Sequence, residues 1–111
     1  MAKKIKSKEL WIGLVEVRPL EGCELLGLAK GAFVNLVTWA SNALEFRQKA
    51  QLVFGELRLF LAGIETAEPL EVRRQREGDF EESIEDIISR AENNPNAIIY
   101  STFHLFERDN A

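Results

Sequence analysis

The stretch AIIYSTFHLF, residues 97–106, decides the fold, because it is a candidate strand with two apolar faces. Strict alternation would divide its side chains into Ile98, Tyr100, Thr102, His104 and Phe106 on one face and Ile99, Ser101, Phe103 and Leu105 on the other. A strand of this kind needs cover on both sides. The chain offers only two clear helices, so we expect part of the sheet to remain as an interface or a ligand groove.

Three further apolar runs, residues 9–18, 32–40 and 59–66, are rich in β-branched, leucine and aromatic residues and predict strands. Residues 20–31 hold three glycines, which predict a loop between the first two strands. Residues 71–78 are nearly all charged, and we interpret them as a solvated connector.

Two helices are predicted from capping pairs that precede apolar residues at helical spacing. Asn42 with Glu45 begins the first helix, and Asp79 with Glu82 begins the second. The apolar stripe of the first helix is Ala43, Phe46, Ala50, Val53, Phe54 and Leu57, and that of the second is Phe80, Ile84, Ile87, Ile88 and Ala91.

The element order, strand, strand, helix, strand, helix, strand, predicts an α+β fold. We expect a two-layer sandwich in which a four-stranded mixed sheet carries two helices mainly on one face. The sheet should be mixed, because right-handed strand–helix–strand units join parallel strands, whereas a long-looped hairpin of the first two strands is antiparallel. A ferredoxin-like arrangement is the nearest common architecture, but only loosely, because residues 20–31 are a poor helix.

The chain of 111 residues fits one domain, which we place at residues 9–111 after a basic flexible tail, residues 1–8. The net charge is −4, and because the four tail lysines contribute +4 the remainder carries −8. Such a body repels phosphate, so we expect no nucleic-acid partner. Residues 10–15, the apolar run behind the lysines, are too few to span a membrane, so we expect no membrane partner and a cytoplasmic location.

The chain has one cysteine, Cys23, and one histidine, His104. We therefore expect no metal site and no cofactor. The carboxylates Glu21 and Glu24 flank the thiol and disfavour a thiolate, so a nucleophile and base pair is not favoured. The sequence assigns no catalytic residue, and we expect a non-catalytic protein.

A homodimer through the second sheet face is the expected assembly, because two-fold pairing is the commonest way in which soluble proteins bury such a patch. The candidate interface residues are Trp11, Trp39, Tyr100, His104 and Phe106. A slip of one residue in strand phase would exchange the faces. A pocket on this face for a small molecule is one alternative.

A second alternative starts from the acidic outer face of the second predicted helix, Glu81, Glu82, Glu85 and Asp86. The first two favour the positive end of the helix and have a structural explanation. The other two do not, and such a face can steer a basic protein toward an acidic inhibitor of the immunity type.

Overall fold

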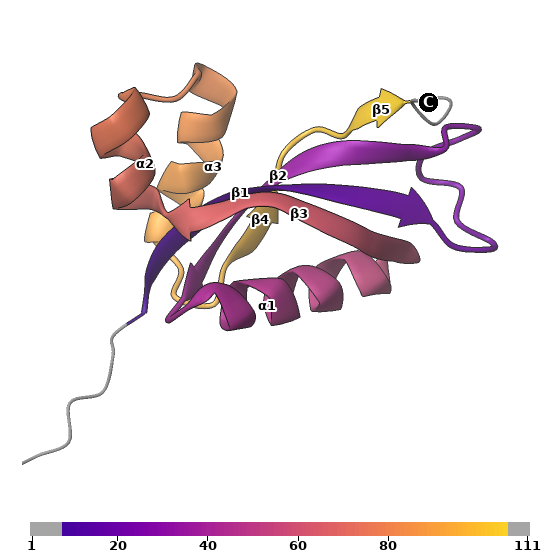
Figure 1. The fold of residues 1–111 in the computed structure, drawn as a ribbon, viewed down its shortest axis with the longest axis horizontal. Helices are drawn as coiled ribbons and strands as arrows, with labels where there is room; N and C mark the ends of the chain where they lie inside the picture. The colour runs from indigo at the N-terminus through magenta and orange to yellow at the C-terminus, as the bar shows by residue number, and fades with distance from the viewer. Residues whose placement is uncertain (1–7, 107–111) are drawn as a thin grey trace, which may run out of the picture.

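The computed structural model describes residues 8–106, and residues 1–7 and 107–111 lie outside that range. The described elements, in chain order (Figure 1), are β1 (Glu9–Pro19), β2 (Gly31–Ala40), α1 (Ala43–Glu56), β3 (Leu59–Pro69), α2 (Leu70–Glu77), α3 (Glu82–Glu92), β4 (Ile98–Tyr100) and β5 (His104–Phe106). The predicted α+β class is confirmed. Apart from Lys8, the predicted basic tail falls outside the described residues.

The strands form one sheet in the order β3-β1-β2-β4, with β5 also pairing with β2, and every described pairing is antiparallel. The prediction of a mixed sheet is therefore wrong. The helix α1 does join β2 to β3, but β3 pairs with β1 instead of β2. The crossover skips a strand, so the two strands that run in the same direction never become neighbours.

The strand predicted at residues 97–106 is interrupted, and its two ends pair separately with β2 as β4 and β5. Between them the hydroxyl of Ser101 accepts a hydrogen bond from the Asn35 N–H, at 3.0 Å, in place of a strand carbonyl. The interruption changes the alternation. Phe103 packs beside Tyr100, with ring centroids 5.4 Å apart, although strict alternation places them on opposite faces.

Helices cover both faces of the sheet, not mainly one as predicted (Figure 1). The helix α1 runs along one face, whereas α2 and α3 stand on the other face at one end of the sheet. The predicted connector, residues 71–78, is instead largely the helix α2. Its sequence is highly charged and lacks the apolar stripe from which a helix is predicted. Leu70 is its one buried residue. Away from α2 and α3 the molecule is the expected two-layer sandwich.

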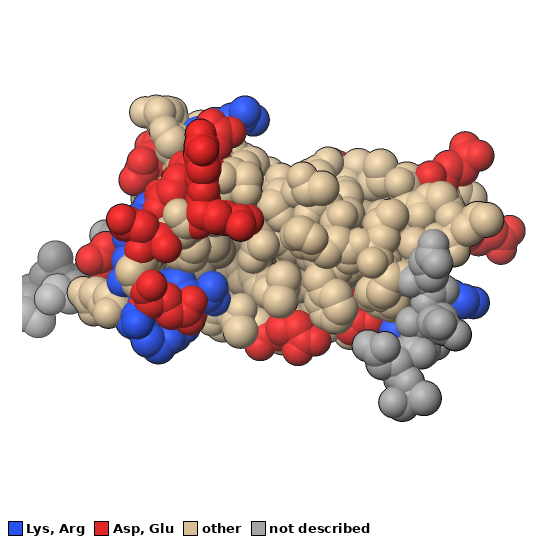
Figure 2. Space-filling view, turned by 90° about the horizontal axis from the view of Figure 1, so that it is seen from above, with Lys and Arg blue, Asp and Glu red and all other residues tan. Residues whose placement is uncertain are grey.

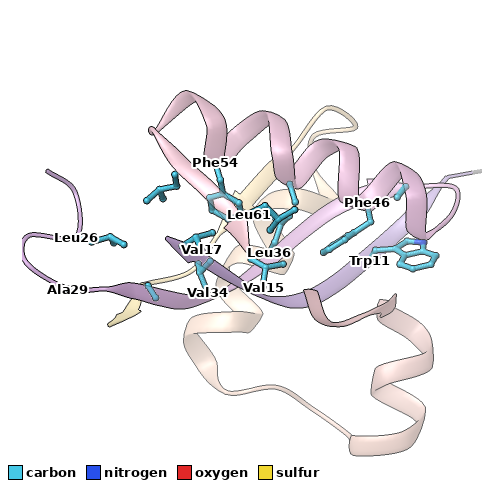
Figure 3. Close-up of a cluster of buried hydrophobic side chains, with 14 residues drawn as sticks. Trp11, Val15, Val17, Leu26, Ala29, Val34, Leu36, Phe46, Phe54 and Leu61 are labelled. Carbon is cyan, nitrogen blue, oxygen red and sulfur yellow. The ribbon is translucent and has the colours of Figure 1, made fainter. Parts of the chain in front are cut away.

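Two cores result, one on each face. The larger core lies between α1 and the sheet (Figure 3) and contains Phe46 and Phe54, neither of which is exposed to solvent. Each such side chain stabilises the fold by roughly 1.5 to 3 kcal/mol. The smaller core joins β1 and β2 to α2 and α3 through residues such as Ile12, Val37 and Ile88.

The predicted cap of α1 is confirmed, because the Asn42 side chain accepts a hydrogen bond from the Glu45 N–H at 2.8 Å. The cap predicted for α3 is wrong. That helix begins at Glu82 without a side-chain cap, and the Glu85 carboxylate accepts the Phe80 N–H at 3.0 Å instead. Glu85, also in the first turn of α3, therefore makes the backbone contact that Asp79 and Glu82 were expected to make.

A close approach of α1 to the sheet depends on Gly13 in β1. A Cβ added there would lie 2.4 Å from the Thr66 carbonyl oxygen and 2.6 Å from Cζ of Phe46. One of these neighbours is backbone and cannot rotate away. The glycine is therefore required by packing between β1, β3 and α1.

We expect Gly13→Ala to lower the free energy of unfolding by about 1 to 3 kcal/mol, because the new methyl group forces β3 or Phe46 to shift. Chemical denaturation followed by circular dichroism measures this. Gly63→Ala in β3 is the matched control, since its Cβ would meet no atom within 4 Å. Equal losses at both positions would contradict the close-packing explanation.

Candidate functional site

The sheet face that carries α2 and α3 is covered by them only at one end, and we call the remainder the open face. Figure 2 shows this face from above, with uncharged side chains across its middle and acidic side chains gathered over α2 and α3. From the strand register, the open face is formed by Leu14, Glu16, Arg18, Phe33, Asn35, Phe60, Thr66, His104 and Phe106.

An aromatic pair on β2 and the edge strand β5 stands in the far half of this face. The rings of Phe33 and Phe106 have centroids 5.5 Å apart, and the Arg18 guanidinium lies 5.4 Å from the Phe106 centroid. Gly31 makes room for this arrangement, because a Cβ there would lie 2.6 Å from Cζ of Phe106. The absence of a Cβ at Gly31 therefore lets the Phe106 ring approach β2 closely.

The charges on the open face are compensated within it. Arg18 pairs with Glu16 at 3.0 Å, and both side chains are partly buried. A charge pair that is already formed loses less on further desolvation than two separate charges. This part of the face can therefore be covered without leaving an isolated charge.

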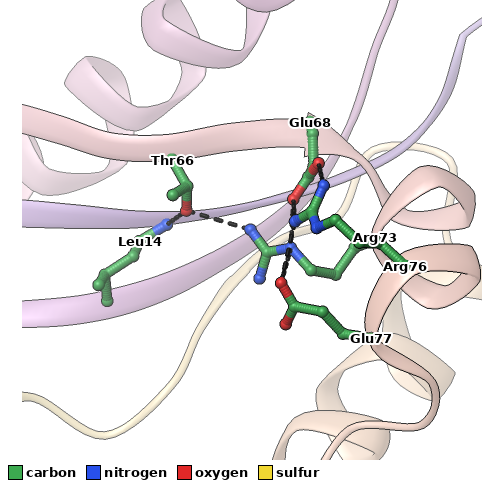
Figure 4. A network of polar contacts seen from close by, with 6 residues as sticks. All are labelled: Leu14, Thr66, Glu68, Arg73, Arg76 and Glu77. Carbon is green, nitrogen blue, oxygen red and sulfur yellow. Dashed lines mark hydrogen bonds and ion pairs between the residues drawn. The ribbon is translucent and has the colours of Figure 1, made fainter.

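One wall of the open face is α2, which is tied to the sheet by a polar network (Figure 4). Glu68 of β3 accepts hydrogen bonds from both Arg73 and Arg76, the latter at 2.7 and 2.8 Å. The Thr66 hydroxyl accepts from the Leu14 N–H at 3.2 Å and from Arg73 at 3.1 Å. This threonine satisfies a backbone donor beside a register shift between β1 and β3.

A second ionic contact joins α2 to α3. Arg74 donates two hydrogen bonds of 2.7 Å to the Glu85 carboxylate and lies over the ring of Phe80, 5.2 Å from its centroid. These bonds hold the pKa of Glu85 at about 2, and the bonds from Arg76 and Arg73 do the same for Glu68. Both carboxylates therefore have a structural role, as ion-pair partners of arginine.

A cleft of about 350 Å³ lies at the corner between α3 and the open face. Ile84 and Ile87 are its apolar lining, and Glu81 and Asp86 bring carboxylates to it. Residues 100–102 and His104 form the opposite side. The cleft therefore combines an apolar surface with negative charge, which suits an aliphatic side chain that ends in a cation.

The structure does not bring the five predicted interface residues together. Trp11 is buried in the α1 core, and Tyr100 packs there against Phe54. Trp39 lies on the opposite face, where its indole N–H donates to the carbonyls of Ala91 and Asn94, both at 2.9 Å. These three side chains make their contacts within one chain and stabilise its fold. His104 and Phe106 are the two that lie on the open face.

The open-face residues missed from the sequence are Leu14, Phe33 and Phe60. The alternation of β1 and β2 did contain a signal, since Leu14 and Phe33 share a phase with Ile12 and Val37. What the sequence could not supply was where the helical cover of that face would end. Phe60, 56% exposed, also depended on the register of β3, which is shifted by two irregularities.

The predicted acidic face is divided by the structure. Glu85 is bound to Arg74, and Asp86 pairs with Arg90 at 2.9 Å on the exposed side of α3. Glu81 accepts a hydrogen bond from the Ser83 hydroxyl at 3.1 Å, and Glu82 is exposed. Glu81 and Asp86 line the cleft, so these two of the predicted four adjoin the open face.

The cysteine and the histidine lie on opposite faces of the sheet. The Cys23 thiol donates to the Leu57 carbonyl at 3.5 Å on the α1 side, whereas His104 is exposed on the open face. Residues 8–106 contain no group of three or more metal-ligating side chains suited to an ion. No helix among these residues is both long and apolar enough to cross a membrane.

No protein-family model, no curated protein and no solved structure matches the chain.

We expect the arginine-bound carboxylates to make stability depend on pH between about 4.5 and 2. Because folding lowers the pKa of Glu68 from 4.5 to about 2, its stabilisation is present above pH 4.5 and is lost as pH falls toward 2. Glu68→Gln should flatten this part of the curve of unfolding free energy against pH. Glu71→Gln, at an exposed position of the same helix, should leave it unchanged. A wild-type slope in Glu68→Gln would contradict the assignment.

Proposed function

We propose that this chain is a small non-catalytic interaction module that associates with a second copy of itself through the open face of its sheet. The observation that carries the proposal is the Phe33 and Phe106 pair, which stands with Phe60 and Leu14 on a face that α2 and α3 leave uncovered. Apolar patches of this kind on soluble proteins mark interaction sites.

A second copy suits this face better than an unrelated partner of one charge. A two-fold axis brings identical surfaces together, so a face must be compatible with itself. The open face meets this condition because its aromatic pair is neutral and its Arg18 and Glu16 charges compensate each other. Two such faces pack as stacked sheets do, with about 10 Å between them.

The mass in solution tests the proposal most simply. Light scattering behind a sizing column should give twice the 12.6 kDa of one chain, at both low and high salt, because apolar contacts are not screened. Phe60→Asp should shift the protein to the monomer, since it places a charge on an exposed part of the open face. Phe106→Asp should act in the same direction.

Leu52→Asp is the matched control, because Leu52 is equally exposed, at 59%, but lies on α1. It should remain a dimer. A wild-type monomer at every concentration would overturn the proposal. In that case a thermal-shift screen with metabolites would test the open face as a small-molecule groove, and salt-dependent capture of a basic protein would test the acidic inhibitor alternative.

A further inference from the structure

The connection between β1 and β2, residues 20–30, carries three exposed leucines, and we call it the apolar tip. Leu28 is fully exposed, Leu25 is 51% exposed and Leu20 is 47% exposed. Single exposed leucines are ordinary on protein surfaces, but this short loop carries three, and Leu28 is the one most available to a partner. Lys30 follows them and is also exposed.

The cleft beside α3 matches the chemistry of this tip. Ile84 and Ile87 belong to the smaller core and are only 5% and 7% exposed, so they present apolar edges that a leucine side chain can contact. The carboxylates Glu81 and Asp86 suit a neighbouring lysine. Asp86 is held by Arg90 through a pair that is more than half exposed, so that pair can be exchanged at little cost. The tip and the cleft are complementary in both polarity and charge.

The open face offers only part of the sheet for contact. It is built from β3, β1, β2 and β5, and α2 and α3 cover the other end of the same face. A tip that docks beside α3 adds contact surface to that of the stacked open faces, because stable interfaces bury about 800 Å² on each partner.

We propose, resting on the self-association argued above, that the apolar tip of each copy docks into the α3 cleft of the other. The second copy is thus the occupant of the cleft, with Leu28 against Ile84 and Ile87 and Lys30 beside Asp86. Each dimer contains this contact twice.

The shape of the molecule favours this arrangement. The helices α2 and α3 rise from one end of the sheet, and the tip lies at the opposite end (Figure 1). A two-fold axis between the stacked faces, directed across the strands, exchanges these ends and keeps the two helical walls apart. Each tip then abuts the side of α3 that borders the open face, where the cleft lies.

A charge exchange between copies tests the docking. Lys30→Glu should raise the dimer dissociation constant at least about tenfold, because it opposes Asp86 in both contacts. Asp86→Lys should do the same by opposing Lys30. An equal mixture of the two variants should restore dimers, since the mixed dimer contains one native and one reversed pair. Sedimentation equilibrium measures all three samples.

The controls separate this inference from the proposed function. Arg47→Glu and Glu56→Lys make equivalent charge changes at exposed positions of α1 and should leave the dissociation constant unchanged. Recovery in the mixture shows that both variants fold. If the two single variants dimerise like wild type while Phe60→Asp is monomeric, the docking of the tip is overturned and association through the open face stands. A monomeric wild type overturns both.

Discussion

The β1 and β2 hairpin is apolar on both of its faces, and burying both faces is the constraint on which the other elements depend. On one face the sheet residues Val15 and Val34 are fully buried beneath α1. On the other, Ile12 and Val37 are buried beneath α2 and α3. Burial of large apolar side chains dominates the stability of such a fold. On the second face, α2 and α3 cover only one end of the sheet, and the uncovered remainder is the open face.

Ionic contacts position the covering helices more than they stabilise them. Glu68 joins α2 to the sheet and Glu85 joins α3 to α2, each through arginine. Pairs near the surface contribute little net free energy, but their bidentate geometry is directional. They fix the place of the helical wall, and therefore the width of the open face and the position of the cleft.

Local sequence patterns predicted the parts of this fold that depend on local physics. The Asn42 cap and the apolar stripe of α3 could be predicted from the sequence, because capping and helical periodicity involve residues three and four apart. The helix α2 was missed because its contribution to the core is Leu70 alone, and its other contacts are to acids elsewhere in the chain.

The pairing of strands and the assignment of faces required longer-range information. Trp11 and Tyr100 were predicted as interface anchors from alternation, yet α1 covers their face. Strict alternation does hold in β1, where Trp11 and Ile12 lie on opposite faces. It failed in residues 97–106, because the interruption near Ser101 changes the phase between β4 and β5. Of the predicted site, His104 and Phe106 lie on the open face.

Intermolecular nuclear Overhauser effects in a sample that mixes isotope-labelled and unlabelled chains test the central claim most directly. We predict contacts between copies from the ring protons of Phe33, Phe60 and Phe106, because these rings stand on the face that the second copy covers. Intermolecular contacts confined to the outer surface of α1, or none from these rings, would contradict it.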